Sequence, residues 1–362
     1  MKTLFSLNEV TLVPANMSTI GHRHECNPYY DGKKLPLFAA PMSCVINKEN
    51  YTQFEDQGIN VVLPRNIDFD FRYKKCINKN CTFSAFSLEE ARKFLDYENI
   101  VYTMQKEGSQ MHVCIDVANG HMRSLIHLCK DLKDKYGDTI QLMAGNIARP
   151  STFVEYARAG VDYVRIGIGG GNVCTTSVCT GIHYPMGSLI EECKKMAGSL
   201  RFTDVKHTPK IVADGGFKNY DQIIKALALG ADYVMLGEIL AKSEEACGEY
   251  ADRFMPPEGW TDEDRKHLIW NEVAKCYYQR IREYYGMSTK QAQIEFGKKG
   301  DKVEEGIHKW VYIDYTIKDW IIKFKASLQS AMSYTNCKTL EAFKNNVTWY
   351  LMSPSAYNSY MK

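Results

Sequence analysis

One short segment combines a thiol, two hydroxyl groups and a run of glycines. It reads GIGGGNVCTT over residues 167–176, so that Cys174 is followed directly by Thr175 and Thr176. A cysteine becomes a nucleophile when nearby dipoles lower its pKa, and a glycine-rich loop lets backbone N–H groups approach a bound anion. The segment is compatible with covalent catalysis beside an anion-binding loop, although a cysteine next to glycines is more often structural.

Further glycine, asparagine and aspartate residues follow short apolar runs along the chain. Eight such runs are rich in Val, Ile, Leu and Ala, and they cover residues 35–41, 59–64, 82–86, 112–116, 140–145, 162–168, 210–216 and 232–237. Runs with little alternation are typical of strands that are buried on both faces of a parallel sheet. Segments with helical periodicity lie between them, at residues 87–98, 122–137, 151–160, 186–198 and 219–230.

Strands that alternate with helices eight times predict an α/β fold, a (β/α)8 TIM barrel. A doubly wound open sheet has a similar local pattern, and the number of repeats favours the barrel. The segments ARAGVDYVRIG and ALALGADYVMLG repeat one device, a helix that ends at glycine before an aspartate and a strand. Because the strand ends of a barrel share one rim, we expect the polar residues after the strands to form the active site.

The chain is expected to form a single barrel domain over residues 1–362. Residues 243–310 are predicted to be an insertion with a flap, and residues 311–362 a C-terminal helical extension. Apolar residues at helical spacing predict a helix within 262–285 and another at 317–334 that closes the barrel. No regulatory insertion interrupts the predicted barrel.

Charge and composition give no sign of a nucleic-acid-binding, secreted or membrane-spanning protein. Forty-five basic and 43 acidic side chains give a net charge of +2, which favours neither nucleic acid nor an anionic membrane as partner. The first residues lack the apolar core of a signal peptide, and no stretch approaches the roughly 18 apolar residues of a membrane span. The 12 cysteines are scattered and show no zinc spacing, so we expect reduced thiols in the cytoplasm.

Several separated motifs carry a family resemblance. GIGGGNVCTT, TGIHYP, VADGG, ADYVMLGE and YYGMS occur in an order that resembles the IMP dehydrogenase/GMP reductase family, from about residue 40 to residue 306 and more loosely to 340. The resemblance implies a barrel that binds a purine nucleoside 5′-monophosphate and a thiol that attacks C2 of the purine. In the dehydrogenase IMP is oxidised by NAD to XMP, and in the reductase GMP loses ammonia and NADPH supplies a hydride to give IMP.

Four local features favour the reductase. Residues 116–120 read DVANG, similar to the reductase loop, and TGIHYP resembles the reductase version of that motif. The regulatory insertion of most dehydrogenases is missing, and only 18 positions separate Met287 from Glu305, too few for the dehydrogenase flap. The resemblance therefore implies NADPH-dependent conversion of GMP to IMP. IMP dehydrogenase with NAD is the alternative, and a non-catalytic purine-nucleotide-binding or assembly protein is a second one.

The resemblance also assigns roles to individual residues. It implies that Cys174 is the nucleophile and that Thr176 and Glu305 form a proton relay. The implied nucleotide-binding residues are Met42, Asn172, Asp214, Gly215, Gly216, Gly237, Glu238, Met287 and Ser288. Arg65, Asp116 and Asn119 would lie on the nicotinamide side, whether the cofactor is NADPH, NADH or NAD. Carbonyl groups of Gly169, Gly171 and Cys174 resemble a potassium-binding loop, and the family usually forms homotetramers.

The sequence departs from the family at positions around this core. Ser177 stands where an arginine is usual, and Glu238 where serine or glycine meets the phosphate. Met42 precedes Ser43 rather than aspartate, and Lys302 and Glu304 replace arginine and serine. A carboxylate that faces a phosphate repels it. These changes lead to the hypothesis that the substrate is a modified purine nucleotide.

Overall fold

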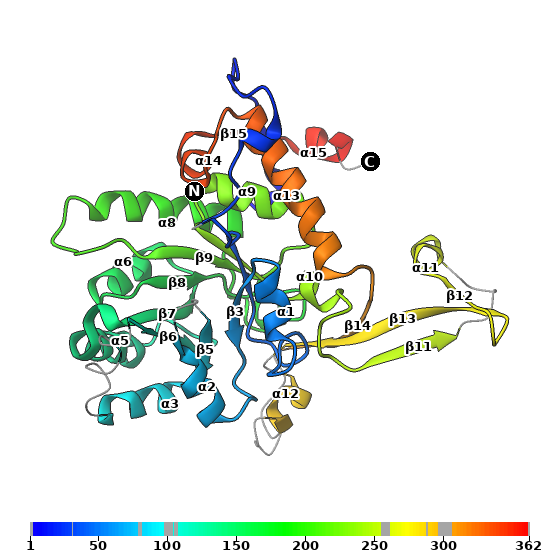
Figure 1. Cartoon of the computed structure of the whole chain (residues 1–362). Coiled ribbons are helices and arrows are strands. Elements are labelled where there is room, and N and C mark those ends of the chain that lie inside the picture. The colour runs from blue at the N-terminus through cyan, green and yellow to red at the C-terminus, as the bar shows by residue number, and fades with distance from the viewer. Residues whose placement is uncertain are drawn as a thin grey trace.

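The computed structural model describes residues 3–30, 32–78, 82–97, 104, 108–254, 261–286, 289–295 and 306–360. Eight parallel strands form a closed barrel, in which each strand pairs with the next and the last pairs with the first (Figure 1). They are β2 (Leu37–Ala39), β3 (Asn60–Leu63), β5 (Phe83–Phe86), β6 (Gln110–Asp116), β7 (Ile140–Ile147), β8 (Tyr163–Ile166), β9 (Lys210–Asp214) and β10 (Tyr233–Leu236). Each lies within one of the eight predicted apolar runs or overlaps it, so the predicted (β/α)8 barrel is confirmed.

The strands are apolar throughout because both of their faces are buried. On β6, Val113 and Ile115 belong to the outer core beneath the helices, whereas Cys114 belongs to a second cluster inside the barrel. The inner cluster includes Phe38 and Phe83, whose rings meet edge to face at 5.8 Å. Since side chains alternate along a strand, the inward position after Cys114 is Asp116, at the rim. The alternation of side chains along each strand thus determines which residues point into the barrel at its carboxyl end.

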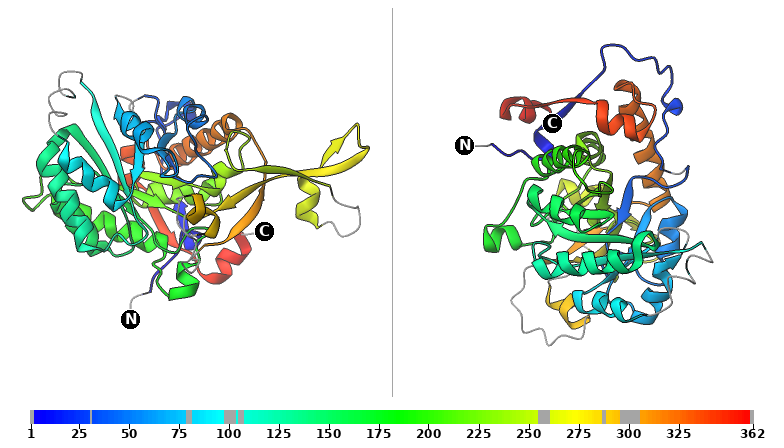
Figure 2. Two further views of the ribbon diagram at one scale, coloured as in Figure 1. Left: turned by 90° about the horizontal axis from the view of Figure 1, so that it is seen from below. Right: turned by 90° about the vertical axis from the view of Figure 1, so that its left-hand side faces the viewer.

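Helices surround the barrel (Figures 1 and 2). They are α1 (Tyr51–Asp56), α2 (Phe69–Cys76), α3 (Leu88–Arg92), α5 (Arg123–Tyr136), α6 (Pro150–Arg158), α7 (Thr176–Thr180), α8 (Met186–Leu200), α9 (Tyr220–Leu229) and α10 (Glu238–Ala241). The short 3-10 helices are η1 (Leu7–Glu9), η2 (Arg23–Glu25), η3 (Lys93–Asp96) and η4 (Gly137–Thr139), and a short strand β4 (Ile77–Asn78) adds antiparallel to β6. The five helical segments predicted between the strands are confirmed.

The repeated helix–glycine–aspartate device has a clear physical basis. Gly160 and Gly230 follow α6 and α9 with φ of 79° and 125°, a conformation that suits glycine. The aspartate two residues later then accepts a hydrogen bond from the backbone of the preceding strand. Asp162 accepts from the N–H of Leu142, and Asp232 accepts from the N–H of Ile211. In both turns the aspartate therefore joins two neighbouring strands by a hydrogen bond at the amino end of the barrel.

The predicted helix within residues 262–285 is wrong. Only α11 (Asp262–Lys266) is helical, and the segment continues as strands β12 (Ile269–Asn271) and β13 (Cys276–Tyr285). With β11 (Tyr250–Phe254) and β14 (His308–Tyr312) they form an antiparallel sheet that projects from the barrel as an arm (Figure 1). The apolar spacing that suggested a helix does not form one face, because Val273 is 96% exposed and Ile281 is buried. A further helix, α12 (Lys290–Glu295), follows β13.

The C-terminal segment packs on the outside of the barrel. The predicted helix at 317–334 is confirmed as α13 (Ile317–Tyr334), and Trp320 and Phe324 of this helix pack against the ring of Tyr220 on α9. The chain continues through α14 (Leu340–Asn346), strand β15 (Thr348–Leu351) and α15 (Pro354–Tyr360). Strand β15 pairs antiparallel with β1 (Val10–Val13), a pairing that the sequence did not predict.

Candidate active site

A cavity of about 530 Å³ opens at the carboxyl ends of the barrel strands, a volume within the usual range for a small-molecule site. Most of the site residues predicted from the sequence line it: Met42, Arg65, Asp116, Gly169, Gly171, Asn172, Cys174, Thr176, Asp214, Gly215, Gly216, Gly237 and Glu238. The strand ends do converge on one rim, as expected for a barrel.

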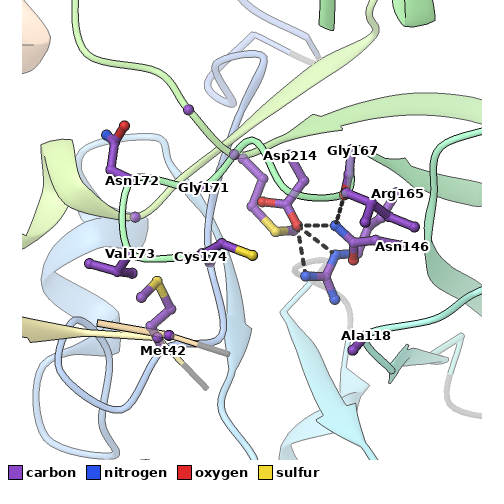
Figure 3. A pocket seen from close by; sticks show the side chains of 18 of the residues that line it. Met42, Ala118, Asn146, Arg165, Gly167, Gly171, Asn172, Val173, Cys174 and Asp214 are labelled. Carbon is purple, nitrogen blue, oxygen red and sulfur yellow. Dashed lines mark hydrogen bonds and ion pairs between the residues drawn. The ribbon is translucent and has the colours of Figure 1, made fainter. Parts of the chain in front are cut away.

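Cys174 lies on the glycine-rich loop after β8, and its side chain points toward the Asp214 side of the pocket (Figure 3). Its Sγ donates a hydrogen bond to Oγ1 of Thr176 at 3.2 Å. The backbone of Cys174 also forms an antiparallel bridge with Gly306, and the N–H of Ile307 donates to the carbonyl of Val173 at 2.9 Å. The thiol thus has a hydroxyl beside it and a second chain segment alongside.

Two glycine loops pack backbone against backbone beside this thiol. Gly216 has a φ of 85°, and a Cβ at this position would lie 2.5 Å from the carbonyl oxygen of Gly170. A Cβ at Gly167 would lie 2.3 Å from the carbonyl oxygen of Asp214. Neither position has room for a side chain. The glycines that the sequence pattern singled out are therefore required for the close approach of these loops.

A chain of charged side chains lines the pocket, and Figure 3 shows the part of it that Arg165 and Asp214 form. Arg165 is buried on the inner face of β8 and donates to Asp116 at 2.6 Å and to Oδ2 of Asp214 at 2.8 Å. The Nδ2 of Asn146 donates to the same Oδ2 at 2.8 Å and to the carbonyl of Gly167 at 3.0 Å. On the other side Nε of Arg65 lies 3.4 Å from Oδ2 of Asp116.

These contacts keep the charges in place despite their burial. Burial alone would raise the pKa of Asp116, but the charges of Arg165 and Arg65 outweigh it, so that the pKa lies below its ordinary value. Burial likewise favours loss of a proton from Arg165, yet Asp214 and Asp116 raise its pKa. Asp116 and Arg165 thus stay charged at neutral pH.

The opposite side of the pocket contains Glu238, at the start of α10. Its carboxylate is paired with Nζ of Lys309 at 2.7 Å. The hydroxyl of Tyr284, which also lines the pocket, donates a hydrogen bond to Sδ of Met42 at 3.7 Å. A Cβ at Gly237 would lie 2.7 Å from that hydroxyl and 2.8 Å from Sδ of Met42. Strand β13 of the arm therefore forms part of the pocket wall.

Four of the predicted site residues are not among the described residues that line the pocket. Asn119 is exposed, is absent from the pocket lining, and accepts a hydrogen bond from the N–H of His121 through Oδ1. Met287, Ser288 and Glu305 lie outside the described residues, as do Lys302 and Glu304. Gly306, which follows Glu305, lines the pocket.

Four functional candidates were missed by sequence reasoning, namely Asn146, Arg165, Tyr284 and Lys309. Arg165 had a usable signal, because a charged residue in the middle of a doubly buried strand needs partners. Asn146 directly follows the apolar run 140–145, at a strand end. Lys309 gave no signal, since its partner Glu238 is 71 residues away in the chain.

Two carbonyl groups of the loop expected to bind potassium already accept hydrogen bonds from nearby residues. The carbonyl of Gly169 accepts from Oγ of Ser177 at 3.2 Å, and the carbonyl of Gly171 accepts from the N–H of Cys174 at 3.0 Å. A carbonyl oxygen has a second lone pair, so the potassium site stays a prediction.

In the described part of the chain no group of three or more His, Cys, Asp or Glu residues could hold a metal ion. Nor is any helix within the described ranges long and apolar enough to cross a membrane.

Comparison with known proteins agrees with this architecture. Residues 91–254 match the family model described as IMP dehydrogenase / GMP reductase domain. The chain is 28% identical over 367 residues to a protein named GMP reductase from Bacillus subtilis (strain 168), an alignment that covers 99% of each chain. A GMP reductase of Mesoplasma florum is 28% identical over 94% of this chain and 95% of its own.

A second kind of relative is more similar over a shorter region. An inosine-5′-monophosphate dehydrogenase of Chlorobaculum parvum is 32% identical over 234 residues, which cover 65% of this chain and 44% of that protein. The matches to GMP reductases extend over nearly the whole chain, whereas this one does not. Together with the closed barrel, the comparisons show that the chain is similar to the IMP dehydrogenase/GMP reductase family, because residues 91–254 match the domain model and nearly the whole chain aligns with GMP reductases.

Proposed function

We propose that this protein converts GMP, or a related purine nucleoside monophosphate, into IMP with NADPH as reductant. The observation that carries the proposal is the position of Cys174 in a nucleotide-sized pocket, with the hydroxyl of Thr176 at 3.2 Å from its thiol. Gly306, the residue that follows Glu305 in the chain, forms a backbone bridge with Cys174. This bridge supports a role for Glu305 close to the thiol.

Cys174 would supply the nucleophile. Its thiolate attacks C2 of the purine, and the bond from C2 to the exocyclic amine breaks, so that the nitrogen leaves as ammonia after accepting a proton. Thr176 is placed to pass that proton, because its hydroxyl is bonded to the thiol. Glu305 is proposed as the other member of this relay. NADPH, when bound, would supply the hydride at C2, and Cys174 would leave C2 as thiolate with the bonding electron pair, which releases IMP.

Asp214 is proposed to hold the ribose. Three donor atoms from Arg165 and Asn146 bond its Oδ2. Its Oδ1 is then available to accept hydrogen bonds from the ribose hydroxyls. The backbone N–H groups of Gly215 and Gly216 would serve the 5′-phosphate together with Asn172 and Gly237, all of which line the pocket. Met42, Met287 and Ser288 remain proposed contacts of the purine.

The nicotinamide side is proposed to be the rim around Asp116. Asp116 and Arg65 line the pocket and are paired with each other, which suits a polar carboxamide group that both accepts and donates hydrogen bonds. Asn119 is also proposed for this side. NADPH rather than NADH, a homotetrameric assembly and a cytoplasmic location are predictions that follow from the family.

IMP dehydrogenase is the second candidate, supported by the identity to the Chlorobaculum parvum protein over 234 residues. A direct assay separates the two. Purified protein is incubated with GMP and NADPH, and in parallel with IMP and NAD, while the absorbance of the reduced cofactor is followed. Loss of absorbance only in the first mixture supports the reductase, and a gain only in the second would replace it.

The Cys174→Ala variant tests the covalent step and the non-catalytic alternative together. Turnover should fall by at least about 1,000-fold, because the variant lacks the nucleophile. Affinity for GMP should stay within a few-fold of that of the unmodified protein. Equal activity in the variant would exclude the covalent mechanism, and absence of turnover with any purine nucleotide in both proteins would favour a binding role.

A further inference from the structure

The ion pair of Glu238 and Lys309 has no role in the scheme above. We propose that Lys309 is a specificity-determining residue, which allows a 5′-phosphate to bind beside the carboxylate of Glu238. The proposal rests on the proposed function, which assigns the 5′-phosphate to this end of the pocket. It concerns how the protein binds a nucleotide in preference to a nucleoside.

A carboxylate at this point of the pocket is a problem for a nucleotide. Glu238 lines the pocket together with Gly216 and Gly237, which are proposed to receive the phosphate. Its side chain is 15% exposed, so water screens its charge only in part. A phosphate dianion placed there would be repelled unless a cation lies close to both groups.

The cations that line the described pocket wall are engaged elsewhere. Arg165 is bound to Asp116 and Asp214, and Arg65 is paired with Asp116. Lys309 is different, because its Nζ lies 2.7 Å from Oε2 of Glu238. The same Nζ lies 5.7 Å from the centre of the Tyr284 ring. Lys309 therefore contacts two residues of the phosphate end.

The fold holds Lys309 in this position while leaving its ammonium group adjustable. Lys309 on β14 is the strand partner of Tyr284 on β13, so its backbone is fixed to the pocket wall. Its side chain is 32% exposed and carries a flexible four-carbon stem. The ammonium group can therefore remain bonded to Glu238 and turn toward a phosphate. An ammonium between two anions attracts both, so that Lys309 offsets the repulsion between Glu238 and the phosphate.

The test measures binding rather than turnover. Calorimetric titrations with GMP and with guanosine are compared for the unmodified protein, Lys309→Met, Glu238→Gln and the double variant. Lys195→Met is the matched control, because Lys195 forms an exposed pair with Glu191 on α8. Circular dichroism and thermal unfolding establish that each variant is folded.

Charge compensation gives a characteristic pattern of affinities. Lys309→Met should weaken GMP binding by about 100-fold, because it leaves Glu238 unpaired opposite the phosphate. Glu238→Gln should leave GMP binding unchanged or tighten it, and the double variant should recover at least about tenfold of the affinity lost in Lys309→Met. Guanosine, which has no phosphate, should bind all variants alike, and Lys195→Met should bind both ligands as the unmodified protein does.

Several results would overturn the proposal. They are a change of less than about twofold in GMP affinity for Lys309→Met, a double variant that binds GMP no better than Lys309→Met, and an unmodified protein that binds guanosine as tightly as GMP. Absence of GMP binding to the unmodified protein would overturn it as well. Failure of the proposed reaction looks different, since GMP would then bind with the expected pattern but would not be turned over with NADPH.

Discussion

Arg165 bonds Asp214 at 2.8 Å and Asp116 at 2.6 Å, and so connects the two carboxylates that are proposed to face the ribose and the nicotinamide. The three residues come from strands β8, β9 and β6 and meet inside the barrel. Both subsites therefore depend on one buried guanidinium group. A displacement of Asp214 is therefore expected to affect Asp116 through Arg165.

Replacing Arg165 with methionine should destabilise the protein strongly. The variant leaves two mostly buried carboxylates without their shared partner, which costs about 3–5 kcal/mol for a broken buried pair. Urea unfolding followed by circular dichroism measures the loss. Arg165→Lys keeps the charge and should lose less stability, so equal losses in the two variants would contradict an electrostatic role.

Replacing Thr176 with valine should slow the reaction without removing nucleotide binding. Valine has nearly the same shape but lacks the hydroxyl that accepts the hydrogen bond from Cys174. We expect a decrease in kcat of about 100-fold, typical for loss of a group that transfers a proton. Thr176→Ser should restore most of the rate, and a valine variant with normal kcat would remove Thr176 from the relay.

The glycine loops offer a matched pair of substitutions. Gly216→Ala should cost about 2 kcal/mol or more, because φ is 85° and the new Cβ would approach the Gly170 carbonyl oxygen to 2.5 Å. Gly170→Ala places its Cβ 3.8 Å from the nearest atom, the carbonyl oxygen of Gly215, and should be tolerated. Thermal unfolding and GMP titration of both variants check this contrast. Similar behaviour of the two would contradict it.

His112 should make the stability of the barrel depend on pH. This side chain is 2% exposed, and burial lowers its pKa from 6.5 to about 4. The native state favours the neutral ring of His112. The stability that this preference provides is therefore complete above about pH 6.5 and is lost as the pH falls toward 4. The loss amounts to about 3 kcal/mol. Urea unfolding between these values should show the decrease, and His112→Leu should reduce it.

Most of the barrel could be predicted from the sequence because its strands are buried on both faces. That environment leaves a continuous apolar run, and the glycine–aspartate turns mark where such runs begin. The arm could not be predicted in the same way. The tyrosines and isoleucine of β13 fit helical spacing as well as strand alternation, and only the pairing with β11, β12 and β14 decides between them.

The candidate site was predictable to the extent that its residues belong to local motifs. Cys174, Thr176 and Asp214 lie in such motifs, and all three line the pocket. Contacts between distant segments were not predictable, because the partners of an ion pair need not share any local pattern. Arg165 and Asp214 are 49 residues apart, and Glu238 and Lys309 are 71 residues apart.

Strand β13 runs without interruption from Cys276 in the arm to Tyr285, directly after the pocket residue Tyr284. At about 3.3 Å per residue it spans roughly 30 Å. Because β13 is paired with β11, β12 and β14 along this length, we expect the outer part of the arm and the wall beside Gly237 to move together. The arm and the pocket wall consequently share one continuous strand.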